Sequence, residues 1–302
     1  MRVTQNMLNN NMLNNLRQNS AEMQRSMEQL STGKKINRPS DDPVVAMKGV
    51  DYRSELSKVE QFERNMSEVR SWMDTSDEAM NEAGQSLQRI RELVVQASND
   101  TYDGDDRANM ASEVEEIKNH LTELANSRVN NKYIFNGANT LEPRFDIDEE
   151  GNRTSENAND DAVEIEVSDG VYIQSNINPE NAFSDEMFNS LDEVVDALRG
   201  GDLEEGEDGA EVRVSQFLDE LDDHNQNLVN ERADLGARMN RADLIENRLS
   251  QQKVTTNQLK SNNEDADMSE VIMNLQMQEN VHRASLGAGA RVLQPTLMDF
   301  LN

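Results

Sequence analysis

Few residues of this chain have the types and spacing that chemistry requires. The three histidines, His120, His224 and His282, lie far apart, on segments whose hydrophobic pattern predicts three separate helices. No pair of them has the short spacing of a metal site. The chain also has no cysteine, which excludes disulfides, thiolate metal sites and cysteine nucleophiles. We therefore predict no metal centre and no nucleophilic catalysis at these residues.

Two short segments could still bind ions. The segment Asp146-Ile-Asp-Glu-Glu-Gly151 begins like an EF-hand loop, but Asn157 stands at the twelfth position, where a bidentate glutamate is required. Lys34 and Lys35, near Arg38, could form a small anion site, although a solvated turn is the simpler interpretation. We predict neither calcium nor a bound cofactor.

Carboxylates are abundant, yet nothing predicts that they catalyse a reaction. An acid–base pair needs a pocket that perturbs its pKa values, and narrow seams between helices offer none. The chain has no P-loop, no dinucleotide-binding glycine motif and no Gly-x-Ser-x-Gly. The sequence therefore predicts a protein that is not an enzyme.

The composition favours long helices over a large globular core. Of the 302 residues, 35% are hydrophobic, 4% aromatic and 29% charged, which suits narrow seams between helices. The net charge of −30 disfavours a nucleic-acid partner. Residues 142–211 hold 23 acidic and 3 basic residues, so most of the excess lies in this one segment. No run is long enough to cross a membrane and the N-terminus has no apolar signal region, which by itself indicates a cytosolic protein.

Hydrophobic residues at steps of three and four predict helices at both ends of the chain. A short seam precedes residue 31, after an Asn-rich turn at residues 9–15, a poor helix former that should fray unless a partner packs against it. A continuous stripe over residues 45–97 predicts a helix of roughly 80 Å at about 1.5 Å per residue. A further helix should follow from about 107 to 130, antiparallel to it. The seam residues of the first helix are Leu13, Leu16, Ser20, Met23, Met27 and Leu30.

The pattern changes in the middle of the chain. Short runs at 133–135, 144–147, 162–167 and 171–174 predict strands, with Ser168-Asp-Gly170 as a hairpin turn. A short helix over 186–198 and an acidic linker over 200–209 complete this part. We expect an exposed, acidic, β-containing insertion over residues 141–210.

Helical patterns return in the last third of the chain. A seam repeats every seven residues from about 211 to 260 and predicts a second rod, antiparallel to the rod of residues 45–97. Asp267-Met-Ser-Glu270 is a capping-box pattern that opens a last helix, in which Pro295 should disturb the final turn. The apolar residues of that helix include Leu286, Leu293, Leu297 and Phe300. It needs a partner, and the N-terminal seam is the obvious one.

The predicted fold is mainly α: an elongated antiparallel bundle of long helices, or coiled coil, built from both chain ends with a small β-containing insertion. Residues 1–41 and 268–302 form an inner pair, and residues 42–140 and 211–267 a long-helix rod. The first joint is a turn in which Gly33 relieves backbone strain and Asp42 caps the helix that Pro43 begins.

Both chain ends resemble the bacterial flagellin superfamily. At the N-terminal end the resemblance rests on Leu30-Ser-Thr-Gly-Lys-Lys-Ile-Asn37 and Ser40-Asp-Asp-Pro43. At the other end it rests on the stretch from Asp267 to Leu301. The Asp-Asp-Pro form and the short ending are more similar to its hook-associated protein 3 branch, the hook–filament junction proteins, than to the filament flagellins.

The resemblance implies a structural role outside the cell, as an adaptor that joins hook to filament by helix packing. It implies export by the flagellar type III apparatus, which agrees with the absent signal peptide. The implied partners are neighbouring copies in a ring, hook-associated protein 1 on the hook side, flagellin on the filament side, and an export chaperone on the C-terminal helix. The implied assembly interface pairs Leu13, Leu16, Met23, Met27 and Leu30 with Leu286, Leu293, Leu297 and Phe300.

Two other interpretations stay open at this point. The chain could be a flagellin or minor flagellin, a subunit of the filament itself. A cytosolic coiled-coil scaffold would explain the seams equally well, but not the motifs at both chain ends.

Overall fold

A computed structural model describes residues 2–98, 104–147, 153–155, 158–200 and 210–293. It divides the chain into two compact units, each built from both halves of the sequence. Unit 1 comprises residues 1–58 and 251–302, and unit 2 comprises residues 59–250. The predicted three-part division into inner pair, rod and insertion concerns layers of an assembly and stays a prediction.

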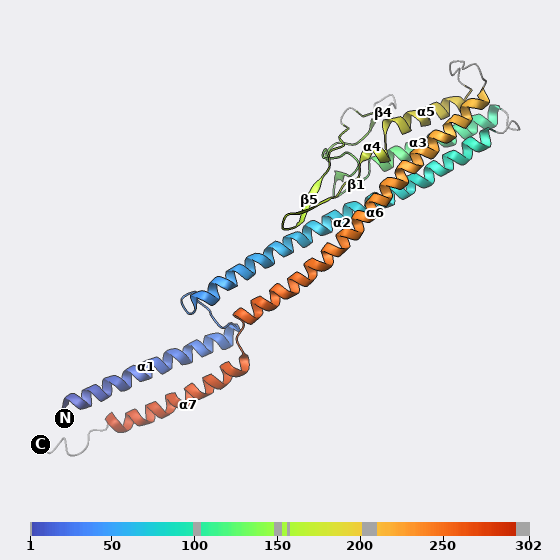
Figure 1. Cartoon of the computed structure of the whole chain (residues 1–302). Helices are drawn as coiled ribbons and strands as arrows, with labels where there is room; N and C mark the ends of the chain where they lie inside the picture. The colour runs from blue at the N-terminus through green and yellow to red at the C-terminus, as the bar shows by residue number, and fades with distance from the viewer. Residues whose placement is uncertain (1, 99–103, 148–152, 156–157, 201–209, 294–302) are drawn as a thin grey trace. The chain divides into compact units, whose positions relative to one another are not determined.

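Helices account for most of the described chain (Figure 1). The C-terminal helix is described as far as Leu293. Pro295, Leu297 and Phe300 therefore lie outside the described residues. The helices are α1 (Arg2–Thr32), α2 (Pro43–Ala97), α3 (Gly104–Ala125), α4 (Pro179–Ala182), α5 (Asp185–Leu198), α6 (Ala210–Glu264) and α7 (Met268–Leu293).

The described strands form three antiparallel two-stranded ladders in the middle of the chain, in which β1 pairs with β2, β3 with β4, and β5 with β6. The hairpin of the last two turns at residues 168–170, as the sequence predicts, and Gly170 there has φ +69°. The strands are β1 (Arg128–Val129), β2 (Lys132–Tyr133), β3 (Asp146–Ile147), β4 (Arg153–Thr154), β5 (Glu164–Ser168) and β6 (Val171–Gln174).

In unit 2, α2 runs antiparallel to both α6 and α3. Arg70 pairs with Asp243 at 2.6 Å and Arg91 pairs with Asp222 at 2.7 Å, so residue numbers rise along α2 as they fall along α6. Arg89 of α2 forms an exposed ion pair with Glu113 of α3, at a distance of 2.7 Å. Beneath these surface pairs the stripe of α2, from Val59 to Ala97, is buried. The helical periodicity therefore predicts the buried faces of unit 2 correctly.

The middle segment shares the core of unit 2 (Figure 1). The rings of Phe135 and Phe183 meet edge to face at 4.8 Å, and those of Phe145 and Phe188 at 4.7 Å. All four side chains are buried. Edge-to-face aromatic pairs add to the stabilisation from burial. The few aromatic residues of the chain are thus concentrated where the segment after α3 packs on the helices.

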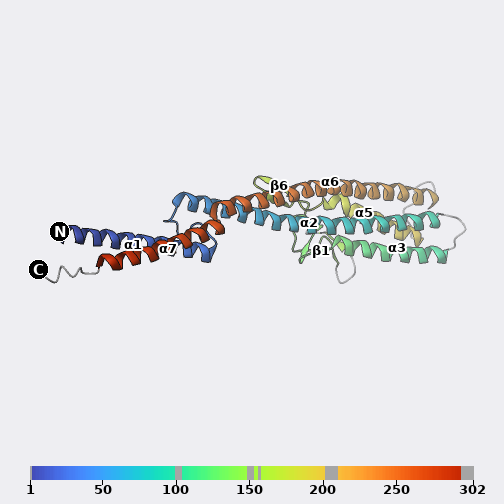
Figure 2. The same cartoon turned by 90° about the horizontal axis from the view of Figure 1, so that it is seen from below.

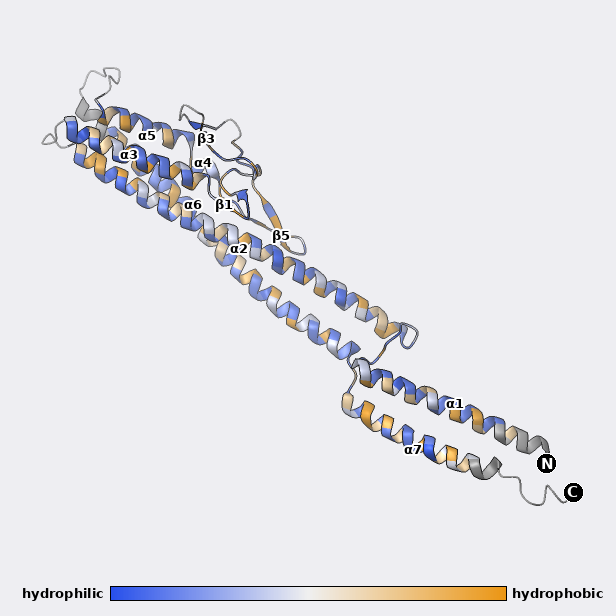
Figure 3. Ribbon diagram, turned by 180° about the vertical axis from the view of Figure 1, so that it is seen from behind, coloured by the Kyte–Doolittle hydropathy of each residue, from blue (hydrophilic) through white to orange (hydrophobic). Residues whose placement is uncertain are grey.

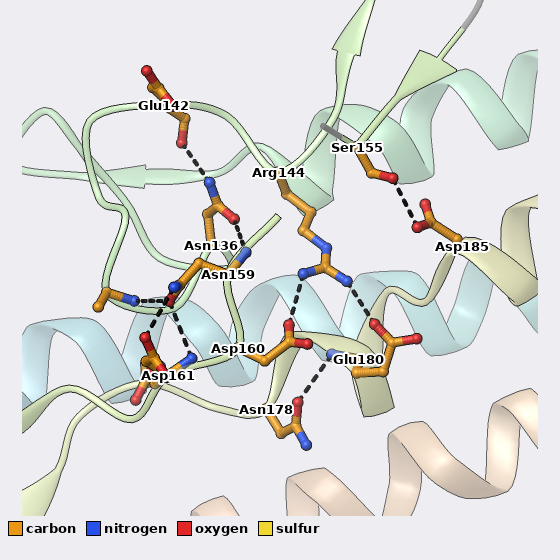
Figure 4. A network of polar contacts seen from close by, with 12 residues as sticks. Asn136, Glu142, Arg144, Ser155, Asn159, Asp160, Asp161, Asn178, Glu180 and Asp185 are labelled. Atoms are coloured by element: carbon orange, nitrogen blue, oxygen red, sulfur yellow. Dashed lines mark hydrogen bonds and ion pairs between the residues drawn. The ribbon is translucent and has the colours of Figure 1, made fainter. Parts of the chain in front are cut away.

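Polar contacts hold the same segment in place (Figure 4). Arg144, whose side chain is 1% exposed, donates to Asp160 and to Glu180, each at 2.8 Å. A buried guanidinium requires such partners, because an unpaired buried charge is strongly destabilising. The side chain of Asn136 donates to the Glu142 carbonyl at 3.1 Å and anchors the loop beside it.

Two polar seam residues of α6 bind the insertion. The buried carboxylate of Glu231 accepts from the backbone of Asn178 at 3.0 Å and from Asn181 at 3.1 Å. Arg238 donates to the Asn176 carbonyl at 2.7 Å and pairs with Glu231 at 3.1 Å. These residues interrupt the heptad seam of α6 because they face a loop instead of a helix.

One predicted helix boundary is wrong. The helix predicted to reach residue 130 ends at Ala125, and a β1–β2 hairpin follows in which Asn130 (φ 50°) and Asn131 (φ 68°) form the turn. Asparagine tolerates this left-handed backbone, so the pair favours a hairpin over a helix end. The Asn-rich segment of residues 9–15 lies inside α1, where α7 packs against it, so the condition set for its ordering is met. None of the helices within the described ranges has an apolar stretch long enough for a bilayer.

Candidate assembly site at the chain ends

The helices α1 and α7 of unit 1 pack side by side and antiparallel (Figures 1 and 2). Met12 contacts Gly289, whereas Ser26, further along α1, contacts Gln278, earlier in α7. Buried and partly buried residues recur on both helices at alternating steps of four and three, the spacing of a coiled-coil seam. The seam consists of Met12, Leu16, Asn19, Met23, Ser26 and Leu30 on α1, and Val271, Leu275, Gln278, His282, Ser285 and Gly289 on α7.

This seam is unusually polar for a helix pair. The Ser26 hydroxyl donates to the side-chain oxygen of Gln278 at 3.1 Å. The Oδ1 atom of Asn19 and the Nδ1 atom of His282 are buried and make no hydrogen bond within the described part of the chain. Polar groups in a coiled-coil seam define the register and lower stability. The pair is therefore specific but weakly held.

The predicted interface residues fall into three groups. Leu16, Met23 and Leu30 lie in the α1 seam and are partly buried against α7. Leu13, Met27 and Leu286 are about half exposed, with 51%, 48% and 50% of their surface free. Leu293 is the last described residue of α7, and Leu297 and Phe300 lie outside the described residues.

Four of the half-exposed apolar residues share one side of the pair. Leu13, Met27, Ile272 and Leu286 each follow a seam residue by one position. In an antiparallel pair these positions lie on the same side of both helices. We call these four residues the apolar flank. Figure 3 shows the apolar residues spread along α7, and an exposed flank of this kind is typical of a surface that packs against another protein.

The joint between α1 and α2 is ordered by its own side chains. Gly33 ends α1 with φ +69°, a backbone conformation that a glycine adopts without strain. The carboxylate of Asp41 accepts from the backbone of Asn37 at 3.3 Å and of Arg38 at 3.0 Å, and these hydrogen bonds lower the pKa of Asp41. Asp42 caps α2 by accepting from the second and third backbone N–H groups after it at 3.0 and 3.1 Å, as predicted.

The link between α6 and α7 meets this turn directly. The backbone N–H of Lys35 donates to the Glu264 carbonyl at 2.6 Å, and that of Ala266 donates to the Gly33 carbonyl at 2.9 Å. The side chain of Asn263 donates to the Val45 carbonyl at 2.9 Å. Backbone hydrogen bonds thus join the turn after α1 to the link between α6 and α7, and the Asn263 side chain adds the start of α2.

A buried carboxylate lies at the centre of this joint. Glu264 is 4% exposed and pairs with Arg53 of α2 at 2.8 Å and with Lys34 at 3.5 Å. Its Oε1 atom lies over Gly49, where a Cβ atom would be only 2.6 Å away. The sequence analysis did not identify Glu264 or Arg53. The available signal was Gly49, a glycine inside a helix where alanine is preferred.

The surface of the joint carries a second ion pair. Lys34 Nζ lies 2.6 Å from Asp265 Oδ1. This hydrogen bond raises the pKa of Lys34 and, together with the Ser261 hydroxyl, lowers the pKa of Asp265. Both side chains are largely exposed, so the pair contributes little stability compared with buried contacts.

Catalytic or metal-binding geometry is not seen in the described ranges. His120, His224 and His282 lie on α3, α6 and α7, and no group of His, Asp and Glu there could hold a metal ion. Burial lowers the pKa of His224, which lies among carboxylates of α5 and α6. The segment that resembles an EF-hand loop falls mostly outside the described residues. What the site offers is a set of packing surfaces.

Comparisons with known families agree with this arrangement. The family model described as the bacterial flagellin N-terminal helical region matches residues 3–140. The model of the bacterial flagellin C-terminal helical region matches residues 218–301. The two matches cover α1 to α3, most of α6 and all of α7, and they leave out the whole insertion of residues 141–210.

Relatives match along most of the chain. Flagellar hook-associated protein 3 of Salmonella typhimurium is 26% identical over 94% of this chain and 95% of its own length. Flagellin of Bacillus subtilis is 28% identical over 89% of this chain and 88% of its own length. Among solved structures, a putative flagellar hook-associated protein from Vibrio parahaemolyticus superposes with a TM-score of 0.66 at 19% identity, over 74% of this chain and all of its own.

A second solved structure, FlgL of Bacillus cereus, superposes with a TM-score of 0.58 at 20% identity, over 70% of this chain and 99% of its own. At such identities the superpositions establish the fold, which confirms the predicted mainly α class with its small β-containing middle. The two family matches, one at each end and together spanning most of the sequence, confirm the resemblance seen in the terminal motifs. The chain belongs to the bacterial flagellin family and is a structural protein of the flagellum.

Proposed function

We propose that this protein is the adaptor that joins the flagellar hook to the filament, and that it acts by helix packing without a catalytic step. Full-length similarity to hook-associated protein 3 of Salmonella typhimurium, on 95% of that protein, supports the junction role. A solved structure from Legionella pneumophila is titled a flagellar junction protein and has the same fold, with a TM-score of 0.56.

The proposed mechanism rests on the apolar flank of the α1/α7 pair. Leu13, Met27, Ile272 and Leu286 are 44–51% exposed on a pair whose own seam is polar. A weakly held helix pair gains stability when a neighbour buries its apolar surface, at roughly 25 cal/mol per Å². Neighbouring copies in a ring are therefore the proposed occupants of the flank.

The remaining partners follow from the family resemblance. Hook-associated protein 1 is the proposed partner on the hook side and flagellin the partner on the filament side. Before assembly the C-terminal helix would bind an export chaperone, and the N-terminal segment would direct type III export out of the cell. In the assembly, residues 1–41 and 268–302 would form the inner layer and residues 42–140 and 211–267 the rod layer. Residues 141–210 would form the outer insertion.

A filament subunit is the second candidate. The flagellin of Bacillus subtilis is as similar as the hook-associated relatives, at 28% identity over 88% of its length. A cytosolic scaffold is disfavoured, because the matched terminal regions belong to a family of flagellar proteins.

Deleting the gene separates these roles. Cells that lack a junction protein should keep intact hooks and release flagellin monomers into the medium. Filaments that remain attached to the hooks would contradict the proposal, and hooks with no flagellin made would indicate a different defect. Labelling purified flagella with an antibody should mark the hook–filament boundary, whereas marking along the filament would favour the flagellin role.

The flank can be tested in the complemented strain. Leu13→Ser and Leu286→Ser should each weaken filament attachment, since serine removes apolar surface from the proposed contact. Val254→Ser is the matched control, because Val254 is 63% exposed on α6 and lies outside the flank. Equal motility of all three strains would contradict the role of the flank.

A further inference from the structure

Glu264 is buried, and no other charged side chain is buried among the described residues of unit 1. We propose that Glu264 is a positioning residue, which sets the orientation of the α1/α7 pair on the adjoining ends of α2 and α6 before assembly begins. The use of this orientation in assembly rests on the function proposed above, whereas the orientation itself is a property of the free chain.

The first argument is the placement of the two cations. Arg53 belongs to α2 and lies 2.8 Å from Glu264, and Lys34 belongs to the turn after α1 and lies 3.5 Å away. A carboxylate at 4% exposure is costly unless it is paired. If either the turn or the helix moved away, the carboxylate would lose a cation, and movement of α2 would also break its close contact with the backbone at Gly49. The pairing therefore favours one relative placement of these elements.

The second argument is the glycine beneath the carboxylate. Gly49 lies inside α2, where glycine lowers helix stability relative to alanine. The side of Gly49 that faces Glu264 has no space for a methyl group, since a Cβ would lie 2.6 Å from Oε1. The glycine is thus explained by the close approach of Glu264 to the α2 backbone.

The third argument is the direct connection to both pairs of helices. The backbone carbonyl of Glu264 accepts from Lys35 in the turn, and the neighbouring Asn263 binds the Val45 carbonyl at the start of α2. The side chain and the backbone of the same residue therefore contact α2 and the α1–α2 turn at once. Lys34 also pairs with Asp265 at 2.6 Å, but both of these side chains are exposed, so this second pair has less influence on orientation than the buried carboxylate.

The coupling between Gly49 and Glu264 gives the first test. Gly49→Ala should lower the melting temperature of unit 1 by roughly 2–4 °C, the shift expected for a modest loss of stability. Gly287→Ala, inside α7 of the same unit and with open space around it, should leave the melting temperature unchanged or raise it. In a Glu264→Ala background, Gly49→Ala should become stabilising. The same destabilisation in both backgrounds would contradict the proposal.

Orientation itself can be measured because the chain has no cysteine. Spin labels on Glu22→Cys in α1 and Ser54→Cys in α2, both exposed, should report a narrow distance distribution in the parent chain. Glu264→Gln should broaden the distribution, since glutamine preserves the shape and removes the charge. Asp243→Asn, which removes an exposed partner of Arg70, is the control and should not broaden it. An unchanged distribution in Glu264→Gln would overturn the proposal.

The single tryptophan separates a local effect from general unfolding. Trp72 lies in the core of unit 2 and is 2% exposed. Its fluorescence should be the same in Glu264→Gln as in the parent chain if the change is confined to the joint, and a red shift would count against a positioning role. These measurements use the free chain, so they can fail or succeed whichever flagellar role the deletion strain reveals.

Discussion

The hydroxyl of Ser26 donates to the side-chain oxygen of Gln278 at 3.1 Å, across the seam that joins α1 to α7. The two residues lie near opposite ends of the sequence, and only folding of the chain brings them into contact. Their hydrogen bond determines the register of the pair and keeps a polar group at a position where a coiled coil would otherwise place an aliphatic side chain.

Replacing one partner should cost stability, and replacing both should restore or increase it. Gln278→Leu leaves the buried Ser26 hydroxyl without a partner, at a cost of about 1 kcal/mol, whereas Ser26→Ala with Gln278→Leu removes both polar groups. Thermal unfolding followed by circular dichroism should show this reversal. Additive effects of the two substitutions would show that the hydrogen bond does not stabilise the pair.

Acid should loosen the joint before it unfolds the chain. Because the Lys34 ammonium and the Ser261 hydroxyl lower the pKa of Asp265 in the folded state, the contribution of Asp265 is present above the unfolded value of about 4 and is lost as the pH falls through the folded pKa. The hydrogen bond to Asp265 raises the pKa of Lys34. The contribution of Lys34 to stability is therefore present below its unfolded pKa of about 10.4 and is lost as the pH rises through the folded pKa.

Urea unfolding at a series of pH values measures this dependence. The parent chain should lose more stability between pH 5 and pH 3 than the variant Lys34→Met, which lacks the largest cause of the lowered pKa of Asp265. Parallel curves for the two proteins would show that the pair has no influence on the stability of the joint. The values used for comparison are free energies of unfolding, extrapolated to water at each pH.

Removing the buried guanidinium of unit 2 should be far more harmful than removing an exposed one. Arg144→Met leaves the half-exposed carboxylates of Asp160 and Glu180 without their shared partner and should cost about 1.5–3 kcal/mol. Arg89→Met breaks an exposed pair with Glu113 and should cost less than about 1 kcal/mol. Chemical denaturation followed by Trp72 fluorescence compares the two, and equal effects would contradict a structural role for Arg144.

The insertion should depend on its aromatic contacts. Phe188→Ala removes a buried ring that packs edge to face on Phe145 and should cost about 3–5 kcal/mol. Leu141→Ala serves as the control because Leu141 is 82% exposed, so its truncation should change stability very little. Limited proteolysis should cut the Phe188→Ala variant faster within residues 141–200, and an unchanged cleavage rate would show that the insertion is held by other contacts.

The sequence by itself determined the helices, because their periodicity is a local property. The stripe from Val45 to Ala97 predicts α2, and Asp42 and Asp267 predict the starts of α2 and α7. The terminal motifs likewise predicted the family. The boundary at Asn130-Asn131 was misjudged, since this left-handed asparagine pair forms a hairpin turn where a helix end was predicted.

The tertiary structure decided the contacts between distant segments. Periodicity marks a residue as part of a face but does not say which element covers it, so Leu13 and Met27 belong to the predicted seam and yet lie half exposed beside it. Polar residues give no periodic signal at all. The sequence did not identify the structural role of three buried charged residues, Arg144, Glu231 and Glu264. A charged group must be paired only where it is buried, and burial is decided by the tertiary structure.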